Sequence, residues 1–434
     1  MRSLPIIVIG AGGAGLVAAW QAASRGAPVI LLERNGKTGI KILISGGGKC
    51  NVTHAGPMDE VGKCFLPREA RFLKHGFHAF SNDDVCALLR TRGVETTTRE
   101  NGRVFPASGR AADVVRAMED LVRAAGAEIR LHTRVDGISA NDGSVRGVTV
   151  EGGTISASQV ILTTGGVSYR KTGTTGDGFA WARALGHTIV PLRPALAPMR
   201  LPLPREWQGI AIRGGRLDVV AGGKKIVSWT GDILCTHEGL SGPAALEVSR
   251  TAAAALEKGP VTLRYDFVPE QDFASLDAAL NDLVRANRSR RISTLLEAWL
   301  PNRMIPGLLA GAGVPPDTRG HVLTREHRRA AVALLKSWEI GGVQGVEIDR
   351  GEVTSGGILL DEVDPRSMRS RIVRGLYVAG EVLDIAGPVG GYNLQAAFST
   401  GYVAGAAAAA EWTEWRPDAS SENGRGARYT RRQG

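Results

Sequence analysis

Gly10-Ala11-Gly12-Gly13-Ala14-Gly15 is the stretch of sequence that decides the fold. An apolar run at residues 4–10 leads into it, a helical pattern at 15–25 follows, and a second apolar run at 27–33 ends on Glu33. This glycine spacing between a strand and a helix, with an acidic residue after the next strand, is typical of a dinucleotide site. The sequence therefore predicts an α/β fold that begins with a Rossmann-like domain.

Each glycine of this fingerprint has a physical task. Gly10 allows a tight turn, Gly12 lets the backbone approach a pyrophosphate, and Gly15 lets the helix pack closely on the strand. The first N–H groups of the helix and its positive dipole end face the phosphates, which adds Gly13 and Ala14 to the expected contacts. Glu33 is expected to bind a ribose and to repel a 2′-phosphate, so NADP is not expected in this site.

Composition and charge limit the class of protein. The 434 residues, 43% of them hydrophobic, suffice for two or three globular domains. No apolar run is long enough to span a membrane, and no secretory signal follows Met1, so we expect a cytoplasmic protein. Its four cysteines have neither metal-site spacing nor the density of a disulfide scaffold.

The net charge of +10 is unevenly distributed. Residues 285–329 contain nine Arg and three acidic residues, a charge of +6, and residues 423–434 contain four Arg and no acid. Such patches can attract nucleic acid, although a solvated helix face is the commoner cause. Nucleic acid is therefore not the expected partner.

The C-terminal part of the chain indicates which dinucleotide binds. Residues 375–381 (GLYVAGE) resemble a second FAD motif, in which an acidic residue at the end of a strand binds the ribityl chain. Glu381 takes that place here. We therefore expect FAD to be held by both ends of the chain.

Four sequence blocks resemble the YhiN/BaiN-type flavoproteins, which are also described as aminoacetone-oxidase-like. They are residues 41–51 (KILISGGGKCN), 172–178 (TGTTGDG), 236–243 (THEGLSGP) and 380–401. The resemblance spans residues 6–405. It implies a Rossmann-like FAD-binding domain interrupted by an insert that has a β-barrel-like part and a small helical part.

The domain limits come from the distribution of proline and of strand and helix patterns. Five prolines between residues 191 and 204 exclude a continuous helix, and strand patterns return from residue 351. We expect residues 1–190 and 350–411 to form the FAD domain and residues 191–349 to form the insert. Within the insert, 191–270 are expected to be β-rich and 271–338 basic and helical, and 412–434 are expected to form a flexible basic tail.

The block at residues 45–51 is assigned to FAD, because successive glycine N–H groups and Lys49 suit a diphosphate or a flavin carbonyl. A nucleoside-triphosphate loop is excluded, because Cys50 stands where Ser or Thr is required and Leu43 where glycine is required. No resolving cysteine lies near Cys50, so packing or flavin contact is favoured over a redox role. The expected contacts in this part of the chain are Arg34, Lys41, Ser45, Gly46, Gly47, Gly48, Cys50, Asn51, Val135, Thr164 and Gly165.

Residues 387–395 (GPVGGYNLQ) precede an alanine-rich helix that is expected to begin near Asn393. The positive end of this helix would stabilise negative charge on a reduced flavin ring. By resemblance, the block lies against the isoalloxazine, and a purely structural glycine turn is the alternative. The expected contacts here are Gly380, Glu381, Gly391, Asn393, Leu394 and Gln395.

Two residues are candidates for acid–base catalysis. His237 could act as a proton donor at the flavin, because histidine is a common general acid, and Tyr392 could donate a hydrogen bond or proton to a substrate. A structural role is the alternative for both. Ser241 lacks the context of a hydrolase nucleophile, and no histidine pattern predicts a metal site.

These observations predict an FAD-dependent oxidoreductase that transfers a hydride between flavin and a small organic substrate, with a reductase or dehydrogenase favoured. A flavin amine or amino-ketone oxidase that produces hydrogen peroxide is the alternative. A flavin-containing protein that binds or modifies RNA is the alternative from another class. No second complete dinucleotide fingerprint is present, so NAD(P)H is expected only as a transient electron donor.

Overall fold

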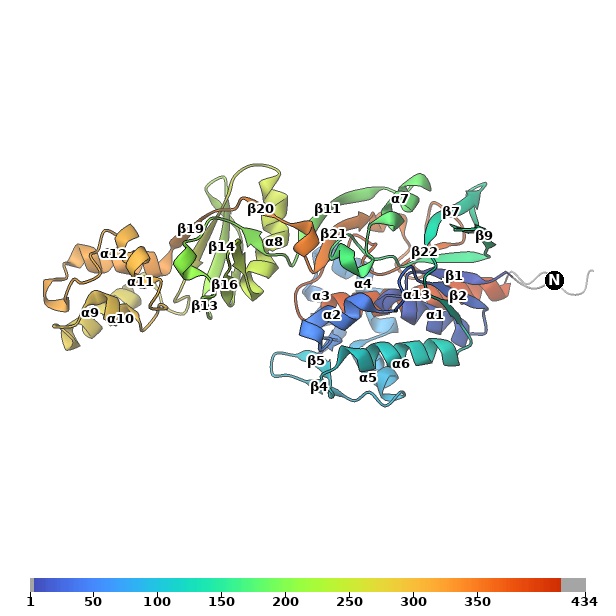
Figure 1. Ribbon diagram of the computed structural model, residues 1–434, viewed down its shortest axis with the longest axis horizontal. Helices are drawn as coiled ribbons and strands as arrows, with labels where there is room; N and C mark the ends of the chain where they lie inside the picture. The colour runs from blue at the N-terminus through green and yellow to red at the C-terminus, as the bar shows by residue number, and fades with distance from the viewer. Residues whose placement is uncertain (1–3, 415–434) are drawn as a thin grey trace, which may run out of the picture.

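The computed structural model describes residues 4–414, which form three bodies in a row (Figure 1). The main body (residues 4–195 and 348–414) contains both ends of the described chain. The β unit (residues 196–272 and 337–347) lies in the middle, and the helical unit (residues 273–336) lies at the far end. The α/β fold class is thereby confirmed.

A five-stranded parallel sheet forms the centre of the main body, in the order β22-β10-β1-β2-β6. β1 is apolar and buried throughout, as expected for the central strand of a sheet covered on both faces. The strand bounds are β1 (Ile6–Ile9), β2 (Val29–Leu32), β6 (Glu128–Arg130), β10 (Gln159–Leu162) and β22 (Leu376–Val378).

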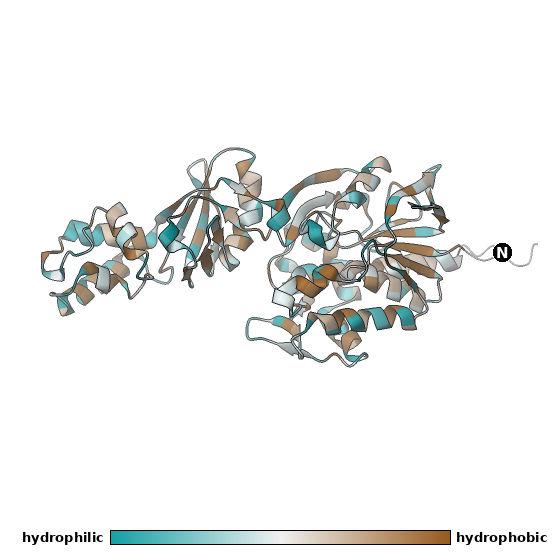
Figure 2. Ribbon diagram, viewed as in Figure 1, coloured by the Kyte–Doolittle hydropathy of each residue, from teal (hydrophilic) through white to brown (hydrophobic). Residues whose placement is uncertain are grey.

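Helices cover one face of this sheet, and a small antiparallel sheet lies on the other (Figure 1). Figure 2 shows apolar residues concentrated on the central strands and on the helices that cover them. The helices of the main body are α1 (Gly13–Ser24), α2 (Ile40–Gly48), α3 (Met58–Lys63), α4 (Pro67–Ala79), α5 (Asn82–Arg90), α6 (Ala111–Ala124), α7 (Asp177–Ala184) and α13 (Tyr392–Glu414), with 3-10 turns η1 (Arg170–Thr172), η4 (Ile348–Arg350) and η5 (Leu360–Glu362).

Three smaller sheets complete the main body. β9 and β10 belong to different sheets, because β9 pairs with β8 whereas β10 pairs with β1. The smaller sheets consist of β3 (Thr53–His54), β4 (Thr96–Thr98) and β5 (Arg103–Pro106); β7 (Val135–Asn141), β8 (Ser144–Val150) and β9 (Gly153–Ser156); and β11 (Ile189–Ala195) with β21 (Val353–Ile358).

The β unit and the helical unit share a second hydrophobic core, separate from that of the main body. Two antiparallel sheets and one helix form the β unit, and four short helices form the helical unit. The β-unit elements are β12 (Met199–Arg200), β13 (Ala211–Ile212), β14 (Arg216–Ala221), β15 (Lys224–Thr230), β16 (Ile233–Cys235), β17 (Gly239–Ser241), β18 (Val261–Asp266), β19 (Trp338–Gly342), β20 (Gly345–Val346), α8 (Pro243–Leu256) and η2 (Arg205–Trp207). The helical unit contains α9 (Phe273–Ala286), α10 (Ile292–Leu296), α11 (Ile305–Gly311), α12 (Arg325–Lys336) and η3 (Gly320–Val322).

The last helix does not end where the tail was expected to begin. α13 continues to Glu414, and Trp412 is buried with its indole Nε1 donating to the backbone oxygen of Leu4 at 3.1 Å. Residues 415–434, the rest of the expected tail, lie outside the described residues, and the other domain limits stay a prediction. Among residues 4–414, none of the helices combines the length and the apolar character that crossing a membrane requires.

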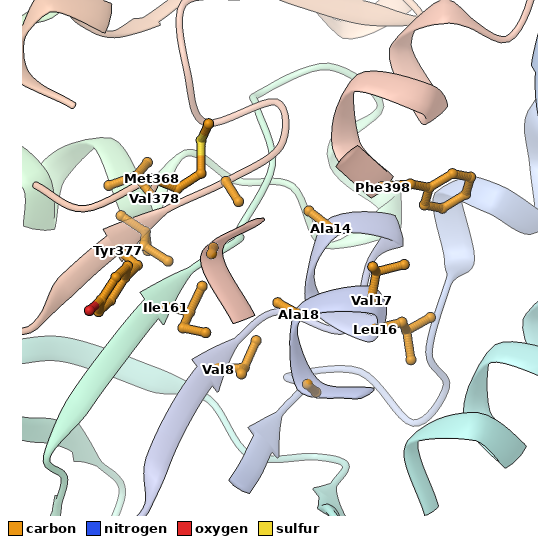
Figure 3. Packing of buried hydrophobic residues seen from close by; sticks show 14 of the residues in the cluster. Val8, Ala14, Leu16, Val17, Ala18, Ile161, Met368, Tyr377, Val378 and Phe398 are labelled. Atoms are coloured by element: carbon orange, nitrogen blue, oxygen red, sulfur yellow. The ribbon is translucent and has the colours of Figure 1, made fainter. Parts of the chain in front are cut away.

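α1 and α13 pack against each other at the level of their backbones. A Cβ atom at Gly401 would lie 2.3 Å from the backbone oxygen of Ala14, and one at Gly405 would lie 2.4 Å from that of Ala18. Figure 3 shows Ala14 and Ala18 on α1 in the cluster that also contains Phe398 of α13. Glycine at 401 and 405 is therefore what brings the two ends of the chain into contact.

Gly401→Ala is expected to lower the free energy of unfolding by about 1–3 kcal/mol, the usual cost of overpacking a core. The added Cβ meets backbone of α1, which cannot rotate away. Gly311→Ala is the matched control, because nothing lies within 4 Å of a Cβ at the end of α11 and alanine favours helix. Urea unfolding measures both variants, and an unchanged midpoint for Gly401→Ala would contradict this packing.

Candidate functional site

A cavity of about 900 Å³ lies in the main body, at the carboxyl ends of the parallel strands. This size is at the upper end of the range for small-molecule sites, about 300–1,000 Å³. Residues one or two positions after the ends of β1, β2, β10 and β22 line it, namely Gly10, Glu33, Thr163 and Gly380. Open α/β sheets bind their ligands at this edge.

The fingerprint turn forms one end of the cavity. Gly10 has a φ of +98°, and a Cβ at Gly15 would lie 1.9 Å from the backbone oxygen of Gly10, so both positions require glycine. Nothing lies within 4 Å of a Cβ at Gly12, which leaves the backbone of this lining residue open to the cavity. The turn therefore offers unobstructed N–H groups at the start of α1 to an anion.

Glu33 fixes this turn as well as lining the cavity. Its Oε2 accepts a hydrogen bond from Ala11 N at 2.9 Å, and its Oε1 accepts from Asn35 N and Asn35 Nδ2 at 2.9 and 2.8 Å. A carboxylate has about four acceptor positions, so one remains for a ligand hydroxyl. The side chain can thus hold the turn and a ribose together.

Two charged pairs cross the middle of the cavity. Arg34 Nη1 lies 2.9 Å from Asp177 Oδ2 and donates to Thr175 Oγ1 at 2.6 Å. Lys41 Nζ lies 2.6 Å from Glu381 Oε2, and Glu381 Oε1 accepts from Thr354 N at 2.8 Å. These contacts hold Glu381 between segments that are distant in the sequence.

The GGG block and the start of α13 also line the cavity. Gly46 and Gly47 have φ values of +56° and +68°, which break α2 there. Asn51 Oδ1 and Thr164 Oγ1 are buried without a hydrogen-bond partner, and both residues line the cavity. Orphaned acceptors and open glycines, including Gly12 and Gly47, fit a long polar cofactor such as FAD.

The side chain of Asn393 forms hydrogen bonds within the protein that stabilise one part of the site. Its Oδ1 accepts from Gly387 N at 2.8 Å, and its Nδ2 donates to Gly387 O at 2.9 Å and to Pro388 O at 3.2 Å. The amide thereby fixes the turn before α13, which begins at Tyr392, one residue from the expected start. The N-terminus of α13 opens on the cavity through Gly391, Asn393 and Leu394.

The cavity lining also includes an arginine pair. Arg99 and Arg103 flank the turn between β4 and β5, and both line the cavity. Arg99 stacks over the ring of Phe105 at 4.0 Å. Arg103 is half-buried, and within the described residues its guanidinium has no hydrogen bond or ion pair within reach.

Two acidic side chains interact with Arg103, namely Glu352, which is exposed at the cavity, and Glu247, which is half-buried. Glu352 lines the cavity, and burial raises its pKa, while Lys41 and Arg103 oppose this shift. Burial also raises the pKa of Glu247 to about 7, opposed by a hydrogen bond from Val389 N at 2.8 Å and by Arg103. Glu247 belongs to α8, so the β unit contacts Val389, a residue of the cavity wall.

A second contact from α8 anchors the β unit. Arg250 Nη2 lies 2.5 Å from Glu69 Oε1 on α4, and Arg250 Nη1 donates to Ala386 O at 2.9 Å. Burial raises the pKa of Glu69, and the arginine opposes this shift. The segment before α13 is thus held by two side chains of the β unit.

Most of the residues expected to contact FAD line this one cavity, although they come from both ends of the chain. Four lie outside the lining, namely Gly15, Gly48, Cys50 and Gln395. The residues brought together are Gly10, Gly12, Gly13, Ala14, Glu33, Arg34, Lys41, Ser45, Gly46, Gly47, Asn51, Val135, Thr164, Gly165, Gly380, Glu381, Gly391, Asn393 and Leu394.

Cys50 and Gln395 have structural surroundings. Cys50 is fully buried, and burial raises the pKa of its thiol to about 12, which keeps it neutral. Gln395 is also fully buried, and it bonds to Thr53 Oγ1 at 2.6 Å, Phe80 O at 3.0 Å and Ser399 Oγ at 2.9 Å. Neither side chain lines the cavity, and the expectation that they contact the cofactor stays a prediction.

Neither catalytic candidate faces the cavity. His237 lies between β16 and β17 of the β unit with 70% of its side chain exposed, close only to Glu238. Tyr392 is buried against His54, with ring centroids 4.7 Å apart, and its ring lies beneath Gly390. Burial raises the pKa of Tyr392. Neither side chain is part of the cavity lining, and both assignments to catalysis stay predictions.

Several lining residues escaped the sequence analysis, including Asn35, Arg99, Arg103, Tyr169, Asp177 and Glu352. Asp177 belongs to the TGTTGDG block, which carried part of the family resemblance but had no function assigned to this residue. Arg103 and Glu352 carry no local pattern that sets them apart from other charged residues. Within residues 4–414, no group of three or more His, Cys, Asp or Glu side chains could hold a metal ion.

Comparison with known proteins extends over nearly the whole chain. It is 31% identical to 3-dehydro-bile acid delta(4,6)-reductase of Clostridium scindens, over 93% of this chain and 98% of the relative. It is 30% identical to ribosomal RNA dihydrouridine synthase of Escherichia coli, over 93% of this chain and 97% of the relative. A solved 3-ketosteroid delta1-dehydrogenase from Sterolibacterium denitrificans shares the fold, with a TM-score of 0.51 and 14% identity over 95% of this chain and all of that one.

The model of the HI0933-like protein Rossmann domain matches residues 4–407. Together with the relatives, this match identifies an FAD-dependent oxidoreductase. The chain belongs to the HI0933-like family.

Proposed function

We propose that this enzyme reduces a carbon–carbon double bond conjugated to a carbonyl group. The two relatives named above, a delta(4,6)-reductase of a keto bile acid and a dihydrouridine synthase, both saturate a bond of this kind in quite different molecules. The two names have the type of reaction in common and differ in the substrate. FAD bound in the cavity would supply the hydride.

The observation that carries this proposal is the unpaired guanidinium of Arg103 at the cavity wall, unpaired within the described part of the chain. Adding a hydride to a conjugated double bond moves negative charge onto the carbonyl oxygen. A fixed cationic donor in a partly buried site stabilises such charge far more than water does. Arg103 is therefore assigned to bind and polarise the substrate carbonyl.

Glu352 is assigned the proton that completes the reduction. Its raised pKa means that it retains a proton to higher pH than an ordinary glutamate. It lies close enough to Arg103 for the two charges to interact, and both line the cavity. A carboxylic acid that lines the same cavity as the carbonyl-binding cation is therefore the proposed general acid.

The rest of the cavity serves the cofactor. The open N–H groups after Gly12 are assigned to its diphosphate, Glu33 to the adenosine ribose, and Glu381 to the ribityl chain. The positive end of α13 is assigned to the flavin ring. Glu33 also excludes a 2′-phosphate by repulsion.

We propose that NAD(P)H, bound transiently, is the electron donor. We also propose that the protein is cytoplasmic. Cys50, Cys64, Cys86 and Cys235 are all unpaired, as in proteins of a reducing compartment. Anaerobic reduction of the yellow protein by NADH and NADPH, followed by reoxidation with oxygen or with cyclic enones, tests the direction. Rapid peroxide formation with no response to enones would instead identify an oxidase.

Arg103→Gln is expected to lower the rate of enone reduction by about 10²–10³, the effect of removing one donor to a developing oxyanion. FAD content should not change, because the proposed contacts of the cofactor do not include this side chain. Single-turnover reoxidation of the photoreduced protein by an enone measures the step. Arg92→Gln, at an exposed position without an ion pair in the described structure, is the control. Equal rates for the two variants would refute the assignment of Arg103.

Glu33→Ala is expected to weaken FAD binding by about tenfold to a hundredfold, because a hydrogen bond to a charged group contributes about 1.5–3 kcal/mol. Removing the carboxylate also removes its hydrogen bonds from Ala11 N and Asn35 N, which hold the turn in the wild type. Flavin fluorescence during titration measures the dissociation constant. Glu151→Ala, at an exposed turn, is the control, and full retention of FAD by Glu33→Ala would contradict the site.

The pH dependence of substrate binding is expected to follow Glu247. Because its pKa is raised to about 7, Glu247 is neutral below that pH and negative above it. The negative form offsets the charge of Arg103, so KM for the enone should rise above about pH 7. Glu247→Gln should give a KM that is flat over this range, and persistence of the rise in the variant would assign it to another group.

A further inference from the structure

The hairpin formed by β4 and β5 places Arg99 and Arg103 opposite each other. Thr98 pairs with Val104, and the register continues to the two arginines, where Arg99 N donates to Arg103 O at 2.9 Å. Residues directly opposite in an antiparallel pair point to the same face, with Cβ atoms about 4.5–5.5 Å apart, and like charges there destabilise the pair. Both arginines line the cavity. An anion bound at this face would remove the repulsion between them.

The turn of this hairpin is held by the neighbouring strand β3. His54 Nε2 lies 3.1 Å from Asn101 O, and Ala55 N donates to Gly102 O at 2.8 Å. Gly102 has a φ of +76°, and a Cβ there would lie 2.3 Å from His54 Cε1, so glycine lets the ring approach the turn. The two arginines therefore extend from a turn whose backbone is fixed on one side.

The guanidinium group of Arg99 rests on an aromatic ring. Its central carbon lies 4.0 Å from the ring centroid of Phe105, which is buried and lines the cavity. Among residues 4–414 the guanidinium has neither an ion pair nor a hydrogen bond. Its five N–H donors lie in the plane of the group, so stacking covers one face and leaves the donors free. Arg99 is thus oriented for a ligand that accepts hydrogen bonds at its edge.

The surroundings of the two arginines differ. Arg103 interacts with Glu352 and with Glu247, and it is already assigned to the substrate carbonyl. Arg99 has no acidic partner within the described part of the chain. One neutral carbonyl group needs only one cation. The positive charge of Arg99 is therefore available for another group of the substrate.

We propose that Arg99 binds a carboxylate of the substrate, so that the enzyme acts on conjugated enones with a carboxylate a few bonds from the double bond. The proposal rests on the reductase activity proposed above. A carboxylate accepts two parallel N–H bonds from one guanidinium, which fixes its orientation as well as its position. Phe105, beneath Arg99, is two residues from Arg103 along β5, and two residues of a strand span roughly 7 Å. Groups bound by both arginines must therefore lie close together in one molecule.

A phosphate group fits this place less well than a carboxylate. A phosphate monoester carries about 1.5–2 negative charges near neutral pH, and Glu352 and Glu247 already add negative charge beside Arg103. A single carboxylate is balanced by Arg99 alone. Apolar residues that also line the cavity suit the hydrocarbon part of such an acid, namely Leu196, Ile385, Pro388 and Val389.

The test compares acetylacrylate with its methyl ester, which keeps the ketone and the double bond but has no charge. The half-saturating concentration and the limiting rate are measured by single-turnover reoxidation of the photoreduced protein with FAD bound. We expect the wild type to be half-saturated by the acid at a concentration at least tenfold lower than by the ester. Arg99→Gln should raise the value for the acid about tenfold to a hundredfold, because a charge-assisted hydrogen bond is lost. The limiting rate should change less, because the carboxylate is bound equally before and during hydride transfer.

Two variants and one inert ligand serve as controls. Arg99→Lys keeps the charge without the planar fork, so its preference for the acid should lie between those of the wild type and Arg99→Gln. Arg92→Gln removes an exposed arginine that does not line the cavity, and it should retain the full preference. Levulinate has the same ketone and carboxylate but no double bond. Its binding to the oxidised protein, followed by calorimetry, reports on the carboxylate site without turnover.

Equal half-saturation of the wild type by acid and ester would overturn the carboxylate site and leave the reductase standing. Equal losses in Arg99→Gln and Arg92→Gln, or tighter binding of inorganic phosphate than of levulinate, would overturn it as well. Levulinate binding that Arg99→Gln weakens at least tenfold, with neither enone reduced, would overturn the reductase and retain the carboxylate site.

Discussion

The backbone contact between α1 and α13 is the constraint on which the site depends. α1 follows the first strand of the sheet and α13 ends the described chain, and Gly401 and Gly405 let α13 lie directly on the backbone of Ala14 and Ala18. Because the two helices cross so closely, their N-termini open on the same cavity. One helix end thereby faces the expected diphosphate and the other the expected flavin ring. Two positive dipole ends favour an electron-rich cofactor and its reduced form.

The β unit adds a second constraint to the same cavity. Arg250 and Glu247 on α8 hold Ala386 and Val389, which flank the turn that leads into α13. The hydrogen bonds of Asn393 then fix that turn from within. Side chains of the β unit therefore hold backbone groups of the segment that leads into α13. A shift of the β unit would move the groups that face the substrate, while the fingerprint end would stay in place.

The parts of the fold and of the site that the sequence predicts are those that depend on residues at short, fixed spacings along the chain. The fingerprint, Glu33 and the start of α13 are encoded by neighbouring residues, because the tight turn, the ribose contact and the helix start each require particular residues a fixed distance apart. Side-chain direction is not encoded in this way. Cys50, Tyr392 and Gln395 lie within the predicted blocks yet turn into the core, because the backbone of each block alternates between the cavity and the interior. Arg103 and Glu352 come from segments that only the tertiary fold brings together.

The separation between chemistry and recognition explains how relatives with about 30% identity can act on very different molecules. Reduction of a conjugated double bond requires the flavin, a cation for the carbonyl and a proton donor, all within the cavity. None of these three groups needs to contact the part of the substrate that lies outside its reacting bond. Binding energy from remote parts of a substrate can instead be used to position its reacting bond.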